Sequence, residues 1–422
     1  MTTVPTIPGV QVPEGDQLMF LRAHVRDLCG TRNSRFPGAQ PVSFNKSSLD
    51  LLLTTDFWVC EKSDGQRVLV LIVVPPATGQ QEVFLIDRKN NYYYVNNLVF
   101  PHHESKPDQF GRPTRLRTDT LLDGELVIDS IAPGQTKLRL LLFDCLVIDG
   151  ENIMRKELGR RYGRLRMNLL PPYQNHLKAD RMAQFVAPFE VQVKHMDLAY
   201  GIEAVLEALK NNIQHESDGL IFTNYNSGYT CGTDQNILKW KPPQDNTIDF
   251  KLQLFFPADL TKNPQGSVCD LTAKPFFQLL QHVKNDEHEE FDYLDMSQEE
   301  WTRWKQSGTQ LDDAIVECAW RPRHGGSPGE FTWHITRIRN DKHTANHKST
   351  VSRILKSIQD GVEQEELLEL APQIRDAWKT PDRVKNRNRV SASAQAIHTD
   401  CRYKQGPKPP MRRGGMPNLI RR

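Results

Sequence analysis

The chain has 422 residues, of which 38% are hydrophobic and 25% are charged, so it is long enough for two or three domains. Its net charge of +2 conceals two opposite regions: residues 379–422 hold 12 Lys/Arg and 2 Asp/Glu, which leaves 42 Lys/Arg and 50 Asp/Glu in residues 1–378. An acidic body with a basic end indicates either a polyanion bound near that end or a solvated, disordered tail.

The seven cysteines are scattered, odd in number and form no CxxC pair. This pattern excludes a disulfide framework and a structural zinc site, and predicts a reduced intracellular protein. The first residues lack the basic-then-apolar pattern of a signal peptide. The longest apolar run, at 68–74, is followed by two prolines and is far too short to span a bilayer, so we expect no membrane partner.

The first region has the pattern of a mixed, largely antiparallel β core with helices outside. Residues 17–30 have helical spacing and end at a glycine, which is a common helix stop. Four strand-like runs follow between residues 56 and 100, separated by turn residues. Further strands are expected at 120–129, 138–150, 189–196, 218–224 and 237–241, and helices at 151–170 and 199–213.

A second region begins at residues 247–256, where a new cluster of alternating strands starts. It continues through an expected acidic loop at 285–295 to strands at 314–323 and 330–341. Several short alternating strands in about a hundred residues predict a small barrel, with the OB-fold as the model. Residues 349–379 are helical in two pieces, and the polar, aperiodic remainder predicts disorder.

The stretch Lys62-Ser63-Asp64-Gly65 lies between two apolar runs. Asp-Gly between such runs predicts a tight hairpin turn, which accounts for Asp64 and Gly65. It does not account for Lys62 or for Arg67, which follows the turn. The K-x-D-G pattern alone is weak, and its significance depends on the charged groups at the ends of neighbouring strands.

Lys239 and Lys241 are the most informative of those charged groups. With a period of two along a strand they point to the same face, where two ammonium groups repel unless an anion such as phosphate lies between them. Their field, together with desolvation, favours the neutral form of a nearby lysine, and only a neutral lysine is a nucleophile. Lys62 is therefore a plausible attacker of an electrophilic phosphorus.

The ordered motif set resembles the covalent nucleotidyltransferase superfamily and, within it, the messenger RNA guanylyltransferases. The motifs are KSDG (62–65), FLIDR (84–88), LLDGELV (121–127), LLFDCL (141–146), DGLIF (218–222), LKWKP (238–242) with TIDF (247–250), and RIRNDKHTAN (337–346). They span most of the chain. The implied fold is α+β with two domains: a nucleotidyltransferase domain with a mixed antiparallel β core and helices, and a C-terminal OB-fold barrel.

The resemblance implies that Lys62 attacks the α-phosphate of GTP, holds GMP as a lysyl phosphoramidate and passes it to the 5′-diphosphate end of a nascent RNA. The expected nucleotide-binding residues are Arg67, Arg88, Glu125, Phe143, Lys194, Lys239, Lys241, Arg339 and Lys342. Phe143 would stack on guanine and Lys194 would read the base. Asp218, Asp249 and Asp341 would support phosphate or metal binding, and Glu125 and Asp249 would hold Mg²⁺ or Mn²⁺.

The domains implied are residues 1–245 for nucleotidyl transfer, 246–348 for the barrel and 380–422 for the basic tail, with the helical stretch 349–379 returning to the first domain. No RNA triphosphatase domain is recognisable, which resembles the fungal arrangement in which that enzyme is a separate subunit. The expected partners are therefore GTP, 5′-diphosphate RNA, an RNA 5′-triphosphatase subunit and the phosphorylated tail of RNA polymerase II. The expected location is the nucleus.

Two other readings remain open from the residues. An ATP-dependent polynucleotide ligase would share K-x-D-G and the barrel, although LKWKP followed by TIDF favours the capping type. A catalytically silent RNA-binding scaffold is the other, although each expected reactive position is filled. A metal hydrolase built on His102-His103-Glu104 or on the acidic residues 286–290 has less support than either of these readings. Neither group has the spacing of metal ligands on a helix, and both are expected on solvated loops.

Overall fold

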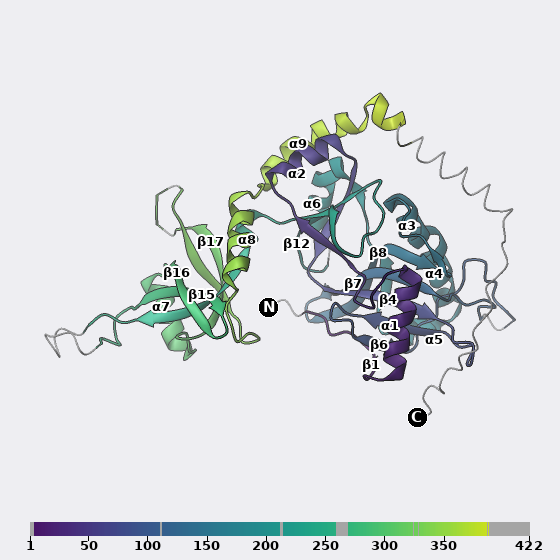
Figure 1. Ribbon diagram of the computed structural model, residues 1–422, viewed down its shortest axis with the longest axis horizontal. Helices are drawn as coiled ribbons and strands as arrows, with labels where there is room; N and C mark the ends of the chain where they lie inside the picture. Colours follow the sequence, from purple (N-terminus) through teal and green to yellow (C-terminus); the bar gives the residue numbers. More distant parts are fainter. Residues whose placement is uncertain are drawn as a thin grey trace. The chain divides into compact units, whose positions relative to one another are not determined.

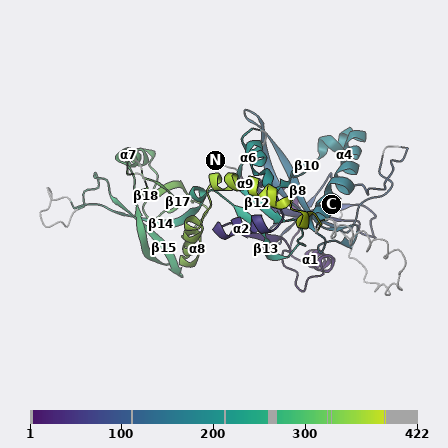
Figure 2. The same cartoon turned by 90° about the horizontal axis from the view of Figure 1, so that it is seen from above.

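The computed structural model describes residues 4–109, 112–211, 214–258, 269–323, 325–327, 329–385 and 387. The chain divides into two compact units. Unit 1 is drawn from Met1–Val42, Ser47–Trp240 and Leu367–Arg422, and unit 2 from Ser43–Lys46 and Lys241–Glu366. Figure 1 and Figure 2 show the elements of each unit in two views. No helix in the described part of the chain is long and apolar enough to cross a membrane.

Unit 1 contains a large, mostly antiparallel sheet in which only the β8–β10 pair is parallel. The strands in spatial order are β1 (Val10–Gln11), β6 (Tyr92–Val95), β5 (Glu82–Ile86), β4 (Gln66–Val73), β7 (Thr120–Ala132), β8 (Gln135–Ile148) and β10 (Glu190–Val193), with β9 (Glu151–Asn152) on β8. Strand β4 explains the unbroken apolar run at 68–74: Val68, Val70 and Ile72 face one core cluster, and Leu69 and Leu71 face another.

Helices cover both faces of the large sheet, which is why its central strands are apolar on both sides. Helix α1 (Asp16–Cys29) packs Leu18, Leu21 and Val25 into the second of those clusters and ends at Gly30, whose φ of 66° is the left-handed cap predicted from the sequence. Helix α3 (Leu158–Arg164), a π turn (Leu165–Leu169) and α4 (Leu170–Ala179) cover the opposite face. Figure 2 shows α1 and α4 on opposite sides of β8.

A second, smaller sheet completes unit 1. Its strands in spatial order are β11 (Asp197–Leu198), β3 (Phe57–Ser63), β12 (Ser217–Asn224), β13 (Gly232–Trp240) and β2 (Ala39–Ser43). The remaining helices of this part of the chain are α2 (Lys46–Thr54), α5 (Arg181–Val186), a 3-10 turn (Ala199–Gly201), α6 (Ile202–Asn211) and α9 (Gln364–Trp378).

The predicted hairpin at Asp64-Gly65 is wrong. Strand β3 belongs to the small sheet and β4 to the large one, so Asp64 and Gly65 connect two sheets rather than two paired strands. Gly65 is required by proximity: a Cβ at this position would lie 2.3 Å from the carbonyl oxygen of Leu126. The K-x-D-G stretch therefore sits where the two sheets meet.

Unit 2 is a closed barrel, as the sequence predicted. Its strands in spatial order are β14 (Thr247–Phe255), β15 (Phe276–Lys284), β16 (Glu287–Leu294), β18 (Phe331–Ile338) and β17 (Ile315–Pro322). Helix α7 (Gln298–Ser307) begins at a capping box between Ser297 and Glu300, and α8 (Lys348–Gln359) follows the last strand. A 3-10 turn (Pro243–Asp245) precedes the barrel.

Three expectations differ from the structure in this region. The acidic segment 285–295 is largely strand β16, because Phe291 and Leu294 face the barrel core while the charged residues face solvent. Of the helical stretch 349–379, α8 packs on the barrel through Val351, and only α9 from Leu367 onward belongs to unit 1. Residues 381–385 of the expected tail are helical, and 388–422 lie outside the described residues.

Candidate active site

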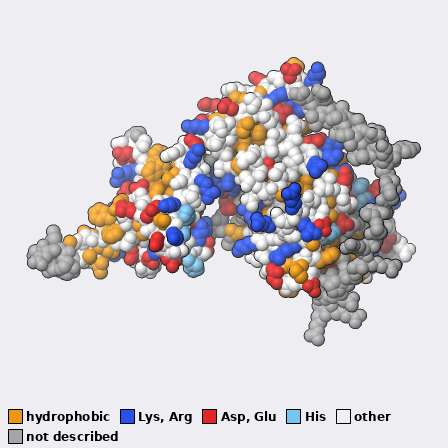
Figure 3. Space-filling view, in the orientation of Figure 1, with side chains coloured by type: hydrophobic (Ala, Val, Ile, Leu, Met, Phe, Trp, Pro, Cys, Tyr) orange, Lys and Arg blue, Asp and Glu red, His pale blue; other side chains and the backbone are white. Residues whose placement is uncertain are grey.

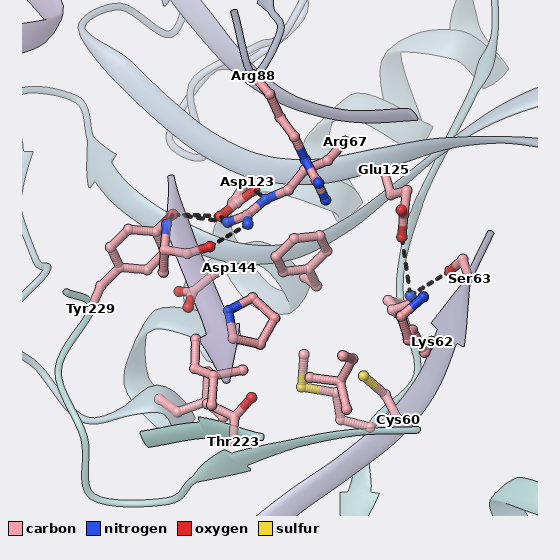
Figure 4. Close-up of a pocket in the computed structure, with 18 residues that line it drawn as sticks. Cys60, Lys62, Ser63, Arg67, Arg88, Asp123, Glu125, Asp144, Thr223 and Tyr229 are labelled. Carbon is pink, nitrogen blue, oxygen red and sulfur yellow. Dashed lines mark hydrogen bonds and ion pairs between the residues drawn. The ribbon is translucent and has the colours of Figure 1, made fainter. Parts of the chain in front are cut away.

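An open cavity lies between the two sheets of unit 1, with about 810 Å³ of empty space that includes the solvent at its mouth. Six residues expected from the sequence line it: Lys62, Arg67, Arg88, Glu125, Phe143 and Lys194. Figure 4 shows Lys62, Ser63 and Glu125 at one end of the cavity and Asp123 and Tyr229 at the other. The structure thus gathers side chains from strands β3, β4, β7 and β8 and from the ends of β5 and β10.

Lys62 lies near the end of β3 and donates a hydrogen bond from Nζ to Oδ1 of Asp218. Asp218 is next to Ser217 at the start of β12, where the pairing between β3 and β12 is irregular between Ser217 and Leu220. Both side chains are partly exposed, Lys62 at 22% and Asp218 at 28%. The amine is thus accessible from the cavity, and a carboxylate that can accept its proton lies next to it.

Phe143 owes its position to a bulge in β8. Asp123 pairs with Asp144 and Gly124 pairs with Leu142, so Phe143 is an extra residue without an opposite partner. A bulge redirects a side chain, and here the ring lines the cavity although β8 is otherwise buried around it. Gly124 is needed opposite, since a Cβ there would lie 3.0 Å from the carbonyl oxygen of Leu141. The backbone of β8 therefore approaches Gly124 closely.

Arg67 is buried on the floor of the cavity and is held by protein groups. Its Nε and Nη2 donate to the two carboxylate oxygens of Asp123 at 3.0 and 2.5 Å, and its Nη1 donates to the carbonyl of Ala39. Burial favours the neutral form, but Asp123 and neighbouring groups outweigh it and raise the pKa of Arg67 above its ordinary value. The guanidinium lies 5.6 Å from the centre of the Phe143 ring. The guanidinium of Arg67 therefore packs against the Phe143 ring and supports its position.

Tyr229 completes this network. Its hydroxyl donates to Oδ2 of Asp123 at 2.5 Å and accepts from the backbone N–H of Ala39 at 2.9 Å. Burial and the adjacent Asp123 carboxylate raise the pKa of Tyr229 well above its ordinary value, so the hydroxyl keeps its proton. A second buried pair, Arg161 with Asp144, is doubly hydrogen-bonded at 2.8 and 3.0 Å. These pairs fix β7 and β8 beneath the cavity.

Arg88 differs from Arg67 because its guanidinium is exposed and points into the cavity (Figure 4). No hydrogen bond or ion pair engages that guanidinium within the described part of the chain, whereas Asp87 is bound to Asn91 in the turn after β5. An arginine held at the rim without a protein carboxylate is available for an anionic ligand.

Lys194 follows β10 and is 4% exposed. Its Nζ donates to the hydroxyl of Ser63 at 2.5 Å and lies 3.5 Å from Oε1 of Glu61 and 3.7 Å from Oε2 of Glu125. It is 6.0 Å from the centre of the Phe143 ring. Burial would lower the pKa of Lys194, but Glu61 and the other neighbours raise it above its ordinary value, so the side chain is a cation.

The two lysines of the LKWKP motif are not equivalent. Lys239 pairs with Ile221, which in turn pairs with Cys60, so these three residues lie in one row on the same face of the small sheet. Ile221 and Cys60 line the cavity, which places Lys239 on its side of the sheet. Strand β13 ends at Trp240, so the predicted alternation does not extend to Lys241, which belongs to unit 2.

The remaining expected residues gather in unit 2. The carboxylate of Asp249, on β14, accepts two hydrogen bonds from Nη1 of Arg339 at 3.0 and 3.2 Å and another from Lys342. Arg339 also donates to Asp341 at 2.9 and 2.8 Å, and this interaction lowers the pKa of Asp341 far below its ordinary value. Asp249 was expected near a metal; in the structure it is the counterion of two residues expected to bind phosphates.

Two carboxylates at the cavity, Glu125 and Asp218, offer oxygen donors for a divalent cation. Glu125 lines the cavity and Asp218 is bound to Lys62 at its edge. Mg²⁺ is commonly held by one or two carboxylates together with substrate phosphates, so these two residues fit a divalent ion that arrives with a nucleotide.

A three-ligand group was also found outside the cavity, at His102, His103 and Glu104 within the described residues. His102 is buried, unlike the solvated loop expected from the sequence, and its Nδ1 accepts a hydrogen bond from the N–H of Glu104 at 3.1 Å.

Several residues of the site were missed in the sequence. Asp123 and Asp144 were visible within the motifs, but their arginine partners could not be assigned. Tyr229 lies in a loop without a recognisable sequence motif. Ser63 occupies only the variable position of the K-x-D-G stretch. Glu61 and His215 form a buried ionic group beside Lys194 that no sequence signal indicated.

Two protein-family models match this chain. The family model for the mRNA capping enzyme catalytic domain matches residues 2–243, and the one for the mRNA capping enzyme C-terminal domain matches residues 245–368. A mycobacterial DNA ligase D complexed with ATP and MES aligns with 72% of this chain and 95% of its own, with 12% identity and a TM-score of 0.34. That likeness is too small to bear on function.

Three relatives carry the name mRNA-capping enzyme subunit alpha. The one from Schizosaccharomyces pombe is 37% identical over 374 residues, which covers 88% of this chain and 89% of the relative. The one from Neurospora crassa is 36% identical and covers 88% and 93%, and the one from Saccharomyces cerevisiae is 37% identical and covers 89% and 87%. With two family matches along the chain and relatives aligned over most of their length, this chain belongs to the mRNA capping enzyme family and is an mRNA guanylyltransferase.

Proposed function

We propose that Lys62 is the nucleophile of the guanylyl transfer. Its neutral Nζ attacks the α-phosphorus of GTP, a P–N bond forms, the bond to the β-phosphate oxygen breaks and pyrophosphate leaves. The β-phosphate oxygen of a 5′-diphosphate RNA then attacks the same phosphorus, the P–N bond breaks and Lys62 regains its electron pair and a proton. The observation that carries this proposal is the Lys62 amine itself, which lines the cavity and is hydrogen-bonded to a carboxylate.

Asp218 is the group that we propose to handle the proton of Lys62. Its Oδ1 accepts the hydrogen bond from Nζ, so the carboxylate lies in direct reach of a proton on the amine. Transfer of that proton to Asp218 or to solvent frees the lone pair for attack. In the second step the same carboxylate returns a proton to the leaving amine.

The base and sugar would lie along the floor of the cavity. Phe143 offers a ring for stacking, and the charged ends of Arg67 and Lys194 lie 5.6 and 6.0 Å from the centre of that ring. Arg88 and Lys239 supply positive charge on opposite walls for the phosphates. Arg339 and Lys342 of unit 2 would bind the β- and γ-phosphates, which requires them to exchange Asp249 for phosphate oxygens.

A divalent cation, which we propose to be Mg²⁺ or Mn²⁺, would be held by Glu125 and, when its proton has moved, by Asp218. When bound it neutralises charge on the phosphate oxygens, while the residues of this chain position them. Asp249 is a less suitable ligand than the sequence suggested, because Arg339 and Lys342 already occupy both of its carboxylate oxygens.

A labelling experiment tests the proposed nucleophile. The protein is incubated with α-³²P-GTP and Mg²⁺ and denatured, with ATP and the Lys62→Ala protein in parallel. We expect label from GTP that is absent from the variant and is discharged by pyrophosphate. Label from ATP instead would indicate a ligase, and label retained by Lys62→Ala would move the nucleophile to another residue.

We also propose the partners of the reaction. The relatives are named subunit alpha, which implies a partner subunit, and we propose that it is an RNA 5′-triphosphatase because the acceptor must be a diphosphate end. The phosphorylated tail of RNA polymerase II and a nuclear location complete the proposal. Co-purification of a triphosphatase activity with the tagged chain from nuclear extract tests it, and capping of triphosphate RNA by the chain alone would contradict it.

A further inference from the structure

The environment of Lys194 contains one carboxylate that the nucleotide site does not use. Glu61 is 7% exposed, and it does not appear among the residues that line the cavity, although its neighbours Cys60 and Lys62 do. Its Oε1 lies 3.5 Å from Nζ of Lys194. Glu61 thus approaches Lys194 from behind the cavity wall.

Glu61 is itself held from the far side. Nε2 of His215 lies 3.7 Å from its Oε1, and Nδ1 of His215 lies 3.0 Å from Oδ1 of the fully buried Asp129. Burial would raise the pKa of Glu61, but Lys194 and then His215 outweigh it and the pKa lies below its ordinary value. The carboxylate is therefore charged and fixed.

The other carboxylate near Lys194 has a different position. Glu125 lies 3.7 Å from Nζ, and it lines the cavity, where the substrate or its cation competes for it. Once Glu125 is engaged, Glu61 is the buried counterion that remains with Lys194. The backbone of Lys194 is fixed as well, by its N–H to Leu142 and by the hydroxyl of Tyr162 to its carbonyl.

We propose that Glu61 is a positioning residue for the selection of guanine. Its carboxylate holds the Lys194 ammonium 6.0 Å from the centre of the Phe143 ring, within reach of the edge of a base that stacks on that ring. Guanine has an acceptor at O6, which an ammonium can bind, whereas adenine has an amino donor there that repels it. This inference rests on the proposed guanylyl transfer and assigns part of its base specificity to a residue outside the cavity.

The experiment measures the rate of lysyl-nucleotide formation with GTP, ITP and ATP. ITP keeps the O6 acceptor and lacks the 2-amino group, so it isolates the contact with Lys194. In Glu61→Gln the shape is kept and the charge is lost. We expect kcat/KM for GTP and ITP to fall about tenfold, mainly through KM, with no fall for ATP, because a hydrogen bond to a charged group is worth about that factor.

Four further proteins separate positioning from general damage. Lys194→Met should lose the same discrimination, and Glu61→Gln should add nothing in the Lys194→Met background, because residues that act through one another are not additive. Glu61→Asp keeps the charge on a shorter side chain, so its GTP-to-ATP ratio should lie between the wild-type and Glu61→Gln ratios. Glu151→Gln is the control, since Glu151 pairs with Arg164 at 3.2 Å and does not line the cavity, and its ratio should be that of wild type.

The inference is overturned if Glu61→Gln leaves the ratio unchanged, if it lowers the rates with GTP and ATP equally, or if its effect adds to that of Lys194→Met. Should Glu61→Gln fail to fold, Glu61→Asp carries the test, and a wild-type ratio in that protein overturns the inference. Wild-type protein that takes no label from GTP would instead refute the proposed function, so the two failures are distinguishable.

Discussion

Arg67 and Asp123 form a doubly hydrogen-bonded ion pair beneath the cavity, with nitrogen–oxygen distances of 3.0 and 2.5 Å and with Asp123 fully buried. Because the pair lies under Phe143, it both stabilises the sheet and holds the Phe143 ring in position. A buried pair of this kind is costly to break from one side, since the remaining charge is left without a partner.

We therefore predict that Asp123→Ala destabilises unit 1 by about 3–5 kcal/mol. Tyr229→Phe should cost less, about 1–3 kcal/mol, since it removes one hydroxyl and leaves the ion pair in place. Calorimetric melting of both variants checks the order. Equal and small losses would show that Arg67 does not depend on Asp123 in the folded protein.

The contact between Lys62 and Asp218 gives a prediction for the chemical step. Asp218→Asn keeps the shape but cannot accept the proton of the amine, so formation of lysyl-GMP should slow about 100-fold or more. Single-turnover labelling with saturating GTP measures this rate. Asp180→Asn is the control, because Asp180 caps α5 on the surface and makes no contact with the site. A wild-type rate for Asp218→Asn would leave Asp218 with a structural role only.

Arg339 bridges Asp249 and Asp341. We expect this bridge to contribute to the formation of lysyl-GMP but not to the transfer of GMP to RNA. Lysine cannot make both pairs, so Arg339→Lys should slow lysyl-GMP formation about tenfold or more. Transfer of GMP from the preformed intermediate to RNA should be unchanged, because pyrophosphate has already left. Arg323→Lys is the control, since the Arg323 side chain is more than half exposed and pairs with Asp295. An equal loss in both steps would refute a role confined to the β- and γ-phosphates.

Cys60 lines the cavity two residues before Lys62 and should nevertheless be unreactive. Burial raises the pKa of its thiol to about 12, and the thiolate is the form that reacts with alkylating reagents. We predict that N-ethylmaleimide at pH 7.5 modifies the exposed Cys269 well before Cys60. Peptide mapping by mass spectrometry after short exposures measures both, with urea-unfolded protein as the reference in which both react. Early modification of Cys60 would show that the cavity opens more widely than the structure.

Much of the fold was readable from the sequence because its signals are local. The run at 68–74 predicts strand β4, and Gly30 predicts the end of α1. The acidic strand β16 was missed because only one face of a barrel strand must be apolar, and two register irregularities with β15 disturb the alternation.

The site was predicted by resemblance rather than by pattern, and its supports were not predicted at all. Asp64-Gly65 has the composition of a hairpin, yet it joins two sheets, because the pairing of β4 with β7 is a long-range choice. Phe143 faces the cavity through a bulge that only the pairing with β7 creates. Glu61 and Lys194 are more than a hundred residues apart, so their contact has no sequence signal.

Glu61 also gives a prediction for the dependence of stability on pH. Its pKa is lower in the folded protein than its ordinary value of about 4.3, so its ion pairing stabilises the fold fully above that pH and is lost as the pH falls through the folded pKa. The destabilisation by Glu61→Gln should therefore be larger at neutral pH than below about pH 4. Urea unfolding at several pH values, with Glu151→Gln as the partly exposed control, measures the difference. A difference that grows on acidification would mean that the Glu61 carboxylate is destabilising where it lies, and that Lys194 is held by Glu125 instead.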